Sequence, residues 1–158
     1  RQALGWFRPL KPEHFRMGRF PVGLIEGDPL PAYVFPEWGV PGFKIGVYHH
    51  ERETGHADAL SREPNATDEA VLREAVRRHF PDADGDLMGL RACLFTNTPD
   101  EHFVVDTLPG APQVVVASPC SGHGYKFASV MGEILADLAT GRRPALDIGL
   151  FTLARLGP

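Results

Sequence analysis

The stretch Gln113-Val-Val-Val-Ala-Ser-Pro-Cys-Ser-Gly-His-Gly-Tyr-Lys-Phe127 carries the strongest fold signal in this chain of 158 residues. Its three consecutive valines predict a buried strand over Gln113–Ala117. A tight turn follows and opens a helix expected over His123–Thr140, which Gly141 ends. The apolar residues of this helix recur at helical spacing on one face: Phe127, Val130, Met131, Ile134, Leu135 and Leu138. The sequence therefore predicts a strand–turn–helix unit.

Short strands occupy most of the remaining chain and are separated by proline, glycine and aspartate. We expect strands over Arg1–Arg8, Phe20–Glu26, Ala32–Phe35, Phe43–Tyr48, Leu87–Thr98 and Phe103–Asp106, with a last one within Ile148–Leu153. One helix is expected over residues 67–80, capped by Thr67 and stopped by Pro81. Because close turns between short strands favour antiparallel pairing, the fold class is α+β, with a mostly antiparallel sheet and one crossing helix.

Composition and charge exclude several classes of function. Hydrophobic residues make up 43% of the chain and charged residues 23%, which is typical of a globular protein of one domain or slightly more. The formal net charge of −4 leaves no basic footprint for nucleic acid, and no apolar stretch is long enough for a membrane helix. Two cysteines, Cys93 and Cys120, are too few for a disulfide scaffold, so we expect a reducing, cytoplasmic location.

Two patterns resemble metal sites but lack the required spacing. Asp82-Ala-Asp84-Gly-Asp86 starts like a calcium loop, yet the positions that need Gly and Glu hold Leu87 and Cys93. A polar turn is the better interpretation of this segment. A zinc site would need two close ligand pairs, and only one is present among the four candidates, which are Cys93, His102, Cys120 and His123. We therefore predict no metal.

The turn Ser121-Gly-His-Gly-Tyr-Lys-Phe127 is the stronger functional candidate. Two glycines allow a ligand to approach the backbone closely, and the start of a helix supplies free N–H groups. Lys126 is expected in the first helical turn, where its charge opposes the helix dipole, and a bound anion would explain it. The alternative is a surface lysine beside a glycine-rich turn.

Lys44 is unusual because it lies inside the apolar segment Phe43–Tyr48. A lone lysine on a two-faced sheet usually points to water. If it faces inward instead, it is a buried cation and a candidate site residue. The adjacent histidines His49 and His50, at the expected strand end, are expected to be exposed.

Three segments together resemble the flavin-dependent amine oxidases that include monomeric sarcosine oxidase and N-methyltryptophan oxidase. They are Gly42-Phe-Lys-Ile-Gly46, Cys93-Leu-Phe-Thr-Asn-Thr-Pro-Asp-Glu-His-Phe103 and Ser121-Gly-His-Gly-Tyr-Lys-Phe127. Their order and spacing agree with the C-terminal part of that family, over nearly the whole chain. The resemblance implies oxidation of the C–N bond of a small secondary or tertiary, often N-methylated, amino acid. It also implies FAD as the cofactor, O2 as the oxidant and hydrogen peroxide as a product.

The resemblance assigns cofactor-binding roles to particular residues. Cys93 matches the cysteine that bonds the flavin covalently in some members. Ser121, Gly122, Gly124 and Lys126 fall in the segment that lies against the flavin ring. The resemblance therefore predicts that this turn and the end of the preceding sheet face the cofactor.

The resemblance also assigns catalytic roles. His123 matches an active-site histidine beside the flavin, and Lys126 matches a lysine that helps to hold the substrate carboxylate. Lys44 matches the lysine near the flavin ring that promotes reaction with oxygen, and Tyr33 matches an active-site aromatic residue. A point charge at Lys126 suits a carboxylate, and an ammonium at Lys44 would stabilise negative charge developing on oxygen.

Two residues depart from the family pattern. Phe95 stands where several members have tyrosine, so a hydroxyl contact to the substrate is absent. A family histidine falls on Tyr48, and His49 comes one residue late. These departures concern the identity of the substrate and leave the oxidase class unchanged.

No G-x-G-x-x-G fingerprint for a dinucleotide follows a strand here. We therefore expect a fragment that begins inside a strand, with a substrate-binding domain over residues 1–108. Residues 109–158 are expected to be the last strand and helix of an incomplete FAD-binding domain. Such a fragment would bind FAD weakly and would not turn over. It would also form a homodimer, or be poorly ordered, through the partly exposed stripe of the last helix.

Two other functions remain open from the sequence. One is a flavin-free module that binds small amino acids on the same sheet. The other is a hydrolase that uses Cys120 and His123 as nucleophile and base. Adjacency in sequence does not establish the geometry that such a pair needs, and no G-x-S-x-G motif is present.

Overall fold

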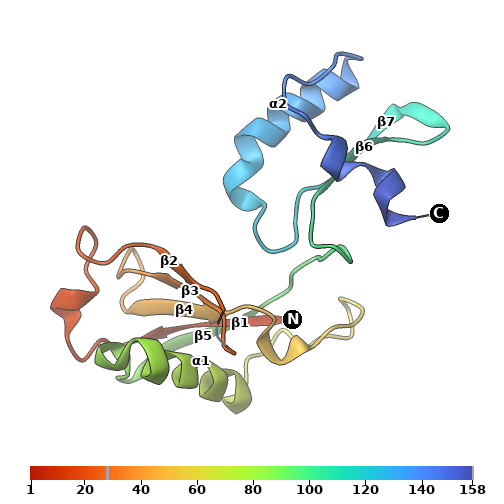
Figure 1. Ribbon diagram of the computed structural model, residues 1–158. Helices are drawn as coiled ribbons and strands as arrows, with labels where there is room; N and C mark the ends of the chain where they lie inside the picture. Colours follow the sequence, from red (N-terminus) through yellow and green to blue (C-terminus); the bar gives the residue numbers. More distant parts are fainter. Residues whose placement is uncertain (28, 158) are drawn as a thin grey trace. The chain divides into compact units, whose positions relative to one another are not determined.

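The chain forms two compact units, Arg1–Leu94 and Phe95–Pro158, each with its own hydrophobic core (Figure 1). The structure is a computed structural model and describes residues 1–27 and 29–157. The division between the units falls after Leu94, earlier in the chain than the expected division after residue 108, because the strand at 104–108 pairs inside the second unit.

The first unit is an antiparallel sheet with one helix packed on it, as the sequence predicts. The strand order is β2-β3-β4-β1-β5, and every pairing is antiparallel. Helix α1 lies across one face of this sheet and contacts β1 and β4 (Figure 1). The elements are β1 (Gln2–Phe7), β2 (Gly23–Ile25), β3 (Ala32–Phe35), β4 (Phe43–Val47), α1 (Ala66–His79) and β5 (Leu87–Cys93), with short 3-10 turns at Pro12–His14, His50–Arg52 and Pro81–Ala83.

The core of this unit lies between the sheet and α1. It consists of alternate strand residues that face the helix and the apolar stripe of the helix itself. Its largest fully buried apolar side chains are Phe7, Phe43, Ile45, Leu72 and Val76. The opposite face of the sheet is not covered by α1.

The second unit pairs two strands and packs one helix on them. Its elements are β6 (Val104–Leu108), β7 (Ala111–Ser118), a 3-10 turn at Tyr125–Phe127, α2 (Ala128–Ala139) and 3-10 turns at Gly149–Phe151 and Leu153–Leu156. Met131 and Ile134 of α2 are buried against Phe103 and Val105. The centre of the helical stripe is therefore covered inside this unit, and self-association through it stays a prediction.

Four sequence predictions for the second unit are wrong in detail. The strand Phe103–Asp106 does not join the first sheet, since β6 pairs with β7. The valines of β7 are not fully buried, because a two-stranded ribbon leaves an edge and a face uncovered. The α-helix starts at Ala128 instead of His123, because residues before it form a turn and a 3-10 segment, where Lys126 lies. The expected strand in Ile148–Leu153 is 3-10 helical.

The start of α1 also differs from the prediction. Asn65, rather than Thr67, caps this helix: its side chain accepts hydrogen bonds from Thr67 N (2.8 Å) and Asp68 N (3.1 Å). The Asp68 carboxylate accepts a bond from Asn65 N (2.9 Å) in return, which completes a capping box. The cap lies two residues earlier than predicted, because the capping residues are polar and the apolar spacing does not mark them.

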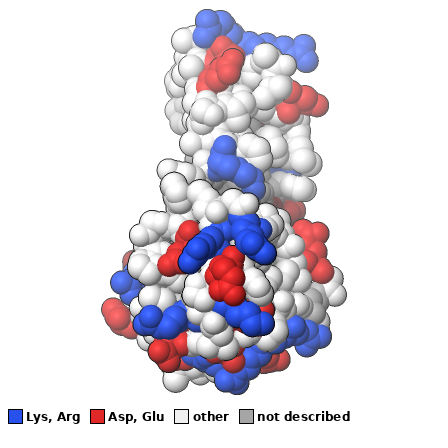
Figure 2. Space-filling model, turned by 90° about the vertical axis from the view of Figure 1, so that its left-hand side faces the viewer, with Lys and Arg blue, Asp and Glu red and all other residues white. Residues whose placement is uncertain are grey.

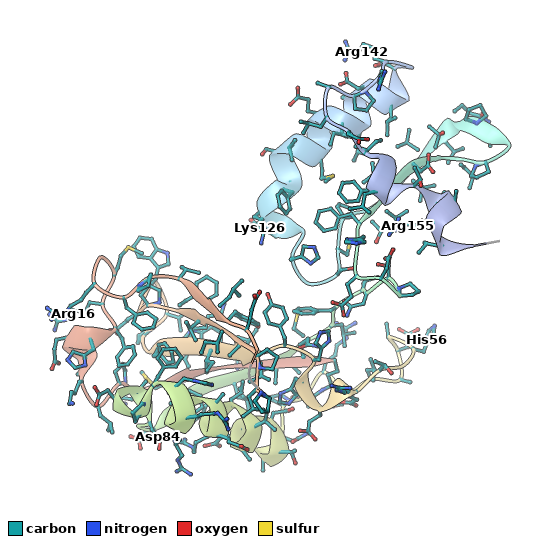
Figure 3. The ribbon with its side chains drawn as sticks, in the orientation of Figure 1. Arg16, His56, Asp84, Lys126, Arg142 and Arg155 are labelled. Atoms are coloured by element: carbon teal, nitrogen blue, oxygen red, sulfur yellow. The ribbon has the colours of Figure 1, made fainter. Side chains whose placement is uncertain are left out.

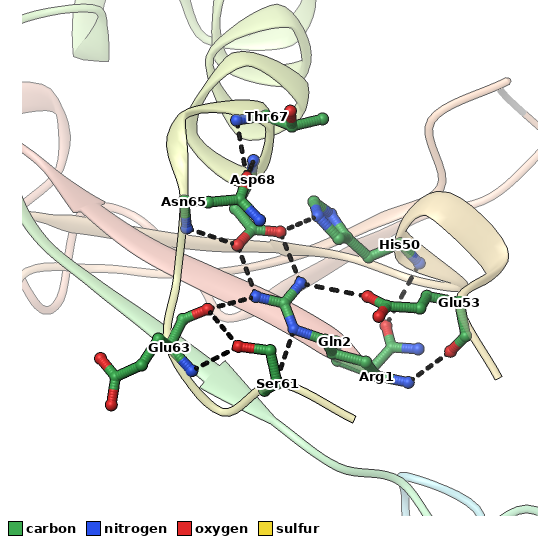
Figure 4. Close-up of polar contacts among 9 residues, drawn as sticks. All are labelled: Arg1, Gln2, His50, Glu53, Ser61, Glu63, Asn65, Thr67 and Asp68. Atoms are coloured by element: carbon green, nitrogen blue, oxygen red, sulfur yellow. Dashed lines mark hydrogen bonds and ion pairs between the residues drawn. The ribbon is translucent and has the colours of Figure 1, made fainter. Parts of the chain in front are cut away.

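Asp68 has a second role, in a buried polar network that joins α1 to β1 (Figure 4). The Arg1 guanidinium donates to both carboxylate oxygens of Asp68, at 2.8 and 2.6 Å, and also donates to the carbonyls of Ser61 and Glu63. His50 Nε2 lies 2.7 Å from Asp68 Oδ1. His50 is buried, contrary to the prediction that both histidines after β4 are exposed, because it completes this network.

Charged side chains elsewhere are interspersed by sign. Figure 2 shows Lys and Arg mixed with Asp and Glu on the face that it presents. No helix in the described part of the chain has both the length and the apolar character required to cross a membrane.

The network makes the stability of the first unit depend on pH. The hydrogen bond from Arg1 is the main cause that lowers the pKa of Asp68 from 3.8 to about 2. The carboxylate therefore stabilises the fold above its unfolded pKa, and that stability is lost as the pH falls from about 4 towards 2. We expect Asp68→Asn to lower the unfolding free energy at pH 7 by about 3 kcal/mol, because a buried charge loses its partner.

Urea unfolding between pH 7 and pH 2.5 measures this loss. Asp58→Asn is the matched control, since the Asp58 side chain is 90% exposed and lies beside an exposed histidine. An Asp68→Asn variant as stable at pH 7 as Asp58→Asn, or one whose deficit does not shrink with acid, would contradict the prediction.

Candidate functional site

Three predicted site residues, Tyr33, Lys44 and Cys93, lie on the same face of the first sheet. Tyr33 lies opposite Gly46 on β4, Lys44 lies opposite Trp6 on β1, and Cys93 pairs with Gln2 on β1. Directly paired residues share a face, as do alternate residues along a strand. This face points away from α1, whose core side chains occupy the other one. The register therefore brings the three residues to one surface.

Tyr33 lies flat across this face because position 46 is glycine. A Cβ at Gly46 would overlap the Tyr33 ring. The ring also contacts Tyr48, with centroids 5.3 Å apart. Burial, helped by the nearby Cys93 and Tyr48, raises the pKa of Tyr33 to about 12. The phenol therefore remains protonated at neutral pH and can donate a hydrogen bond.

Lys44 is half-buried, so neither sequence alternative describes it fully. Its ammonium lies 4.9 Å from the centre of the Phe35 ring and 5.5 Å from that of Trp6. These are cation–π distances, and no ion pair of Lys44 is found within the part of the chain that the structure describes. Two rings therefore hold the charge, and its N–H groups stay available to a ligand.

Cys93 ends β5 and is exposed. Its thiol makes one weak contact, 3.7 Å from the Leu94 carbonyl oxygen. Cys120, the other cysteine, is also free and exposed. Exposure alone therefore does not distinguish the two thiols. What distinguishes Cys93 is its position on the same sheet face as Tyr33 and Lys44.

In the second unit, Ser121 anchors the glycine-rich turn. Its backbone has a left-handed φ of 48°, and its side chain is buried. Ser121 N donates to the Thr96 carbonyl (2.9 Å), and Thr98 N donates to Ser121 Oγ (3.4 Å). The hydroxyl is thus used inside the protein, and the cofactor role implied by the resemblance stays a prediction.

Both glycines of this turn are required by the turn itself. Gly122 has a φ of 75°, and a Cβ there would overlap the Phe95 ring. A Cβ on Gly124 would overlap the carbonyl oxygen of Pro119, which is backbone and cannot rotate away. Sequence reasoning attributed these glycines to the approach of a ligand, whereas the structure gives them an internal steric cause.

His123 is held in one orientation by two contacts. Its Nδ1 lies 2.7 Å from the Ser121 carbonyl oxygen, and its ring stacks on Phe103 with centroids 4.8 Å apart. A carbonyl oxygen can only accept, so Nδ1 carries the proton of this bond. In the neutral ring, Nε2 is therefore the unprotonated nitrogen and can accept a proton or a hydrogen bond.

The segment after His123 presents hydrogen-bond donors. Within the described residues, four backbone N–H groups here have no acceptor: those of Gly122, Gly124, Tyr125 and Lys126. The Lys126 side chain is exposed at the start of α2 (Figure 3), and among the described residues its ammonium contacts only the Phe127 ring, at 5.6 Å. Free N–H groups beside an ammonium suit an anionic or carbonyl-rich ligand. This donor set fits the pyrimidine edge of a flavin, whose negative charge upon reduction such donors stabilise.

The other sequence candidates are engaged elsewhere. Asp82 contacts Lys11 and His14, and Asp84 contacts two arginines of α1, so the calcium-like loop is a paired turn. No group of three or more metal-binding side chains occurs among residues 1–27 and 29–157. The Nδ1 atom of His123 is bound to Ser121.

Sequence reasoning missed the residues that position the site. Gly46 is recognised only once β3 and β4 are in register, since Tyr33 lies 13 positions before it in the printed sequence. Trp6 and Phe35 flank Lys44 from two different strands. The apolar, aromatic character of all three strands was the available signal, but it did not specify their faces.

Residues 4–138 match the model of a family described as FAD dependent oxidoreductase, DAO. This chain belongs to that family. The family model covers both the sheet face with Lys44 and the turn with His123.

Curated relatives in this family are longer than the chain. Monomeric sarcosine oxidase from Bacillus sp. (strain NS-129) is 40% identical over 157 residues, which are 98% of this chain and 40% of the relative. The enzyme of that name from Arthrobacter sp. (strain TE1826) is 36% identical over the same shares. N-methyl-L-tryptophan oxidase from Salmonella newport (strain SL254) is 46% identical over 90 residues, 57% of this chain and 24% of the relative. The chain thus spans about 40% of the length of the first two relatives.

Two solved structures of longer oxidases share the fold. Fructosamine oxidase (Amadoriase II) from Aspergillus fumigatus superimposes with a TM-score of 0.69 and 20% identity, over 96% of this chain and 38% of that one. NikD, an amino acid oxidase of nikkomycin biosynthesis, gives a TM-score of 0.66 and 21% identity, over 96% and 40%. At these identities the likeness concerns the fold alone.

Because steric contacts inside the turn require Gly122 and Gly124, alanine should destabilise the protein at these two positions but not at a glycine with open space around it. Gly124→Ala should disrupt the turn, because backbone atoms of Pro119 occupy the space. Gly122→Ala should also destabilise it, and Phe95→Leu should partly restore the double variant by vacating ring volume. Gly132→Ala in α2 is the control: nothing lies within 4 Å of its Cβ position, so it should stabilise the helix by about 0.5–1 kcal/mol.

Thermal unfolding of the three single variants and the Gly122→Ala, Phe95→Leu double variant measures this order. Equal melting temperatures for Gly124→Ala and Gly132→Ala would show that the turn tolerates a side chain.

Proposed function

We propose that this chain supplies the substrate-facing sheet and the flavin-facing turn of an FAD-dependent oxidase. The reaction is oxidation of the C–N bond of a small secondary or tertiary, N-methylated amino acid by O2, with hydrogen peroxide as a product. The observation that carries the proposal is the turn at residues 121–126, where free N–H groups, an oriented imidazole and an exposed ammonium occur together. In this proposal residues 1–108 supply the substrate-facing sheet together with Cys93, and residues 109–158 supply the flavin-facing turn together with Lys126.

The residues of the second unit have distinct roles in this proposal. When bound, FAD would supply the acceptor for the hydride equivalent that leaves the substrate carbon. Lys126 holds the substrate carboxylate as a point charge. Gly122 and Gly124 offer backbone N–H groups that stabilise negative charge on the cofactor. His123 presents Nε2 as an acceptor whose direction the Ser121 carbonyl determines.

The residues of the first unit complete the proposed chemistry. The Lys44 ammonium, held by the Trp6 and Phe35 rings, stabilises negative charge that develops on oxygen. Tyr33 donates a hydrogen bond to the substrate, since its phenol stays protonated at neutral pH. Cys93, exposed at the end of β5, is the attachment point for a covalently bound flavin. Two free thiols are compatible with a cytoplasmic location.

The departures from the family pattern bear on the substrate. Phe95 packs against Gly122 and has no hydroxyl to offer. Tyr48 contacts Tyr33 at the position of a family histidine. Because the residues at these two positions depart from the family pattern, we expect a substrate other than sarcosine to be oxidised best.

The assay for this function uses the whole reading frame that encodes these residues. With FAD and a panel of N-methyl amino acids, we expect substrate-dependent peroxide, measured by a peroxidase-coupled assay. The 158 residues alone should bind FAD weakly and produce no peroxide, because the relative from Bacillus sp. is about two and a half times as long. Lys126→Ala should raise KM by about tenfold or more, since a charged contact to the carboxylate is lost.

Lys11→Ala is the matched control, because Lys11 pairs with Asp82 on the surface of the other unit. Its KM should remain that of the parent protein. If the full-length protein binds N-methyl amino acids by fluorescence titration in the absence of flavin, and gives no peroxide with it, the flavin-free binding module replaces this proposal.

Covalent flavin attachment is tested separately. After denaturing electrophoresis of the full-length protein, we expect a yellow, fluorescent band that is lost in Cys93→Ser. Cys120→Ser is the control, since Cys120 is equally free and exposed. Loss of the band in Cys120→Ser instead would transfer the role to the other thiol, and no band in any protein would mean that the flavin is held without a covalent bond.

A further inference from the structure

A chain of polar contacts runs from Arg155 to the turn that holds His123. Arg155 Nε donates to Asp100 Oδ2 (2.7 Å) and its Nη2 to Asp100 Oδ1 (3.3 Å), a two-point contact. The same guanidinium donates to the His102 carbonyl (3.1 Å) and the Thr152 carbonyl (2.9 Å). Only 15% of the Arg155 side chain is exposed, so it lies within the unit rather than on its surface.

Arg155 is itself firmly placed. Leu153 N donates to Asp106 Oδ2 at 2.8 Å, which ties the last 3-10 segment to β6. A guanidinium anchored at its backbone and directed at one carboxylate has little freedom. The pair therefore restrains the loop that carries Asp100.

Thr98 passes this restraint on to the turn. Its hydroxyl lies 2.9 Å from Asp100 Oδ1 and 2.7 Å from the His102 carbonyl oxygen, and it can donate to either. Its backbone N–H donates to Ser121 Oγ (3.4 Å), and the two hydroxyl oxygens lie 3.5 Å apart. Arg155, through Asp100, thus reaches the residue that anchors the turn.

Ser121 then determines the imidazole. Its carbonyl accepts the Nδ1 proton of His123, and Phe103, directly after His102 in the same loop, stacks on the ring. Both contacts of His123 therefore come from elements that the Asp100 loop positions. A shift of this loop would release both together.

We propose that Arg155 and Asp100 are positioning residues for His123, and that their ion pair holds the imidazole with its Nδ1 proton on Ser121 and Nε2 free. Neither residue reaches the ring directly, and both act through Thr98 and Ser121. The effect on turnover rests on the proposed function, whereas the tautomer of His123 does not. Arg155 lies outside residues 4–138, so the family match itself does not point to it.

The direct test is the tautomer. Long-range ¹H–¹⁵N NMR of the imidazole in this chain should show the Nδ1–H form of His123. In Arg155→Gln we expect a mixture of both tautomers, and Arg155→Lys, which retains the charge, should keep most of the Nδ1–H form. Arg142→Gln is the matched control: it breaks an arginine–aspartate contact of 2.9 Å, to Asp137, at the opposite end of α2 from Lys126 (Figure 3). It should leave the tautomer unchanged.

Asp100→Asn keeps the test valid if Arg155→Gln fails to fold, because it removes the charge of the side chain while keeping its shape. It should shift the tautomer as Arg155→Gln does. In the full-length enzyme, both variants should lower kcat about tenfold with KM changed less than about twofold, as expected when an oriented group is displaced but the carboxylate contact at Lys126 remains.

Two outcomes would overturn the inference. One is a pure Nδ1–H tautomer in Asp100→Asn, whether or not Arg155→Gln folds. The other is an equal shift in Arg142→Gln, which would indicate a general loss of stability in this unit. If the tautomers shift as expected but no variant or parent forms peroxide, the positioning role stands and the proposed oxidase function fails.

Discussion

The buried ion pair between Arg1 and Asp68 is the contact on which the first unit depends. It joins strand β1, which lies between β4 and β5, to the helix that covers the sheet, and both side chains are only 2% exposed. Since β1 pairs with both β4 and β5, its register decides which residues of those strands share a face. Fixing β1 against α1 therefore also determines that Lys44 and Cys93 point to the side away from the helix. The polar network and the uncovered face of the sheet therefore both follow from the position of β1 against α1.

In the second unit, backbone packing rather than an ion pair holds the site residues in place. Its turn brings Gly124 so close to Pro119 that a side chain cannot fit, and Ser121 takes a left-handed conformation. These constraints are local, and they leave a row of N–H groups without partners among the described residues. Because the close backbone packing of this turn leaves its N–H donors unpaired, the turn needs few side chains to bind a ligand. Lys126 and His123 add charge and direction to it.

The sequence predicted the elements well where an apolar pattern marked them. Ala32–Phe35 forms β3 as expected, and α1 begins within one residue of its predicted start because its apolar stripe is regular. The pattern does not reveal what polar residues contact. His50 looked exposed beside a strand end, yet it is buried against Asp68, which is distant in sequence. The prediction that β6 joins the first sheet was wrong for the same reason, because pairing between strands depends on contacts that a linear pattern does not contain.

The candidate site shows the same division. Motif resemblance singled out Lys44, Cys93 and His123, but not the residues that orient them, such as Phe35 and Phe103. Those supports come from other elements and have no spacing of their own. The register of the sheet and the geometry of the turn were needed to find them.

The bond from His123 to the Ser121 carbonyl has a consequence for how charge moves in this turn. Because Nδ1 already carries a hydrogen that the carbonyl holds, the ring gains or loses a proton only through Nε2. Nε2 can therefore accept a hydrogen bond without rotation of the ring and without loss of its stack on Phe103. Acceptance at this turn is restricted to one nitrogen, which belongs to the same segment as the free N–H groups.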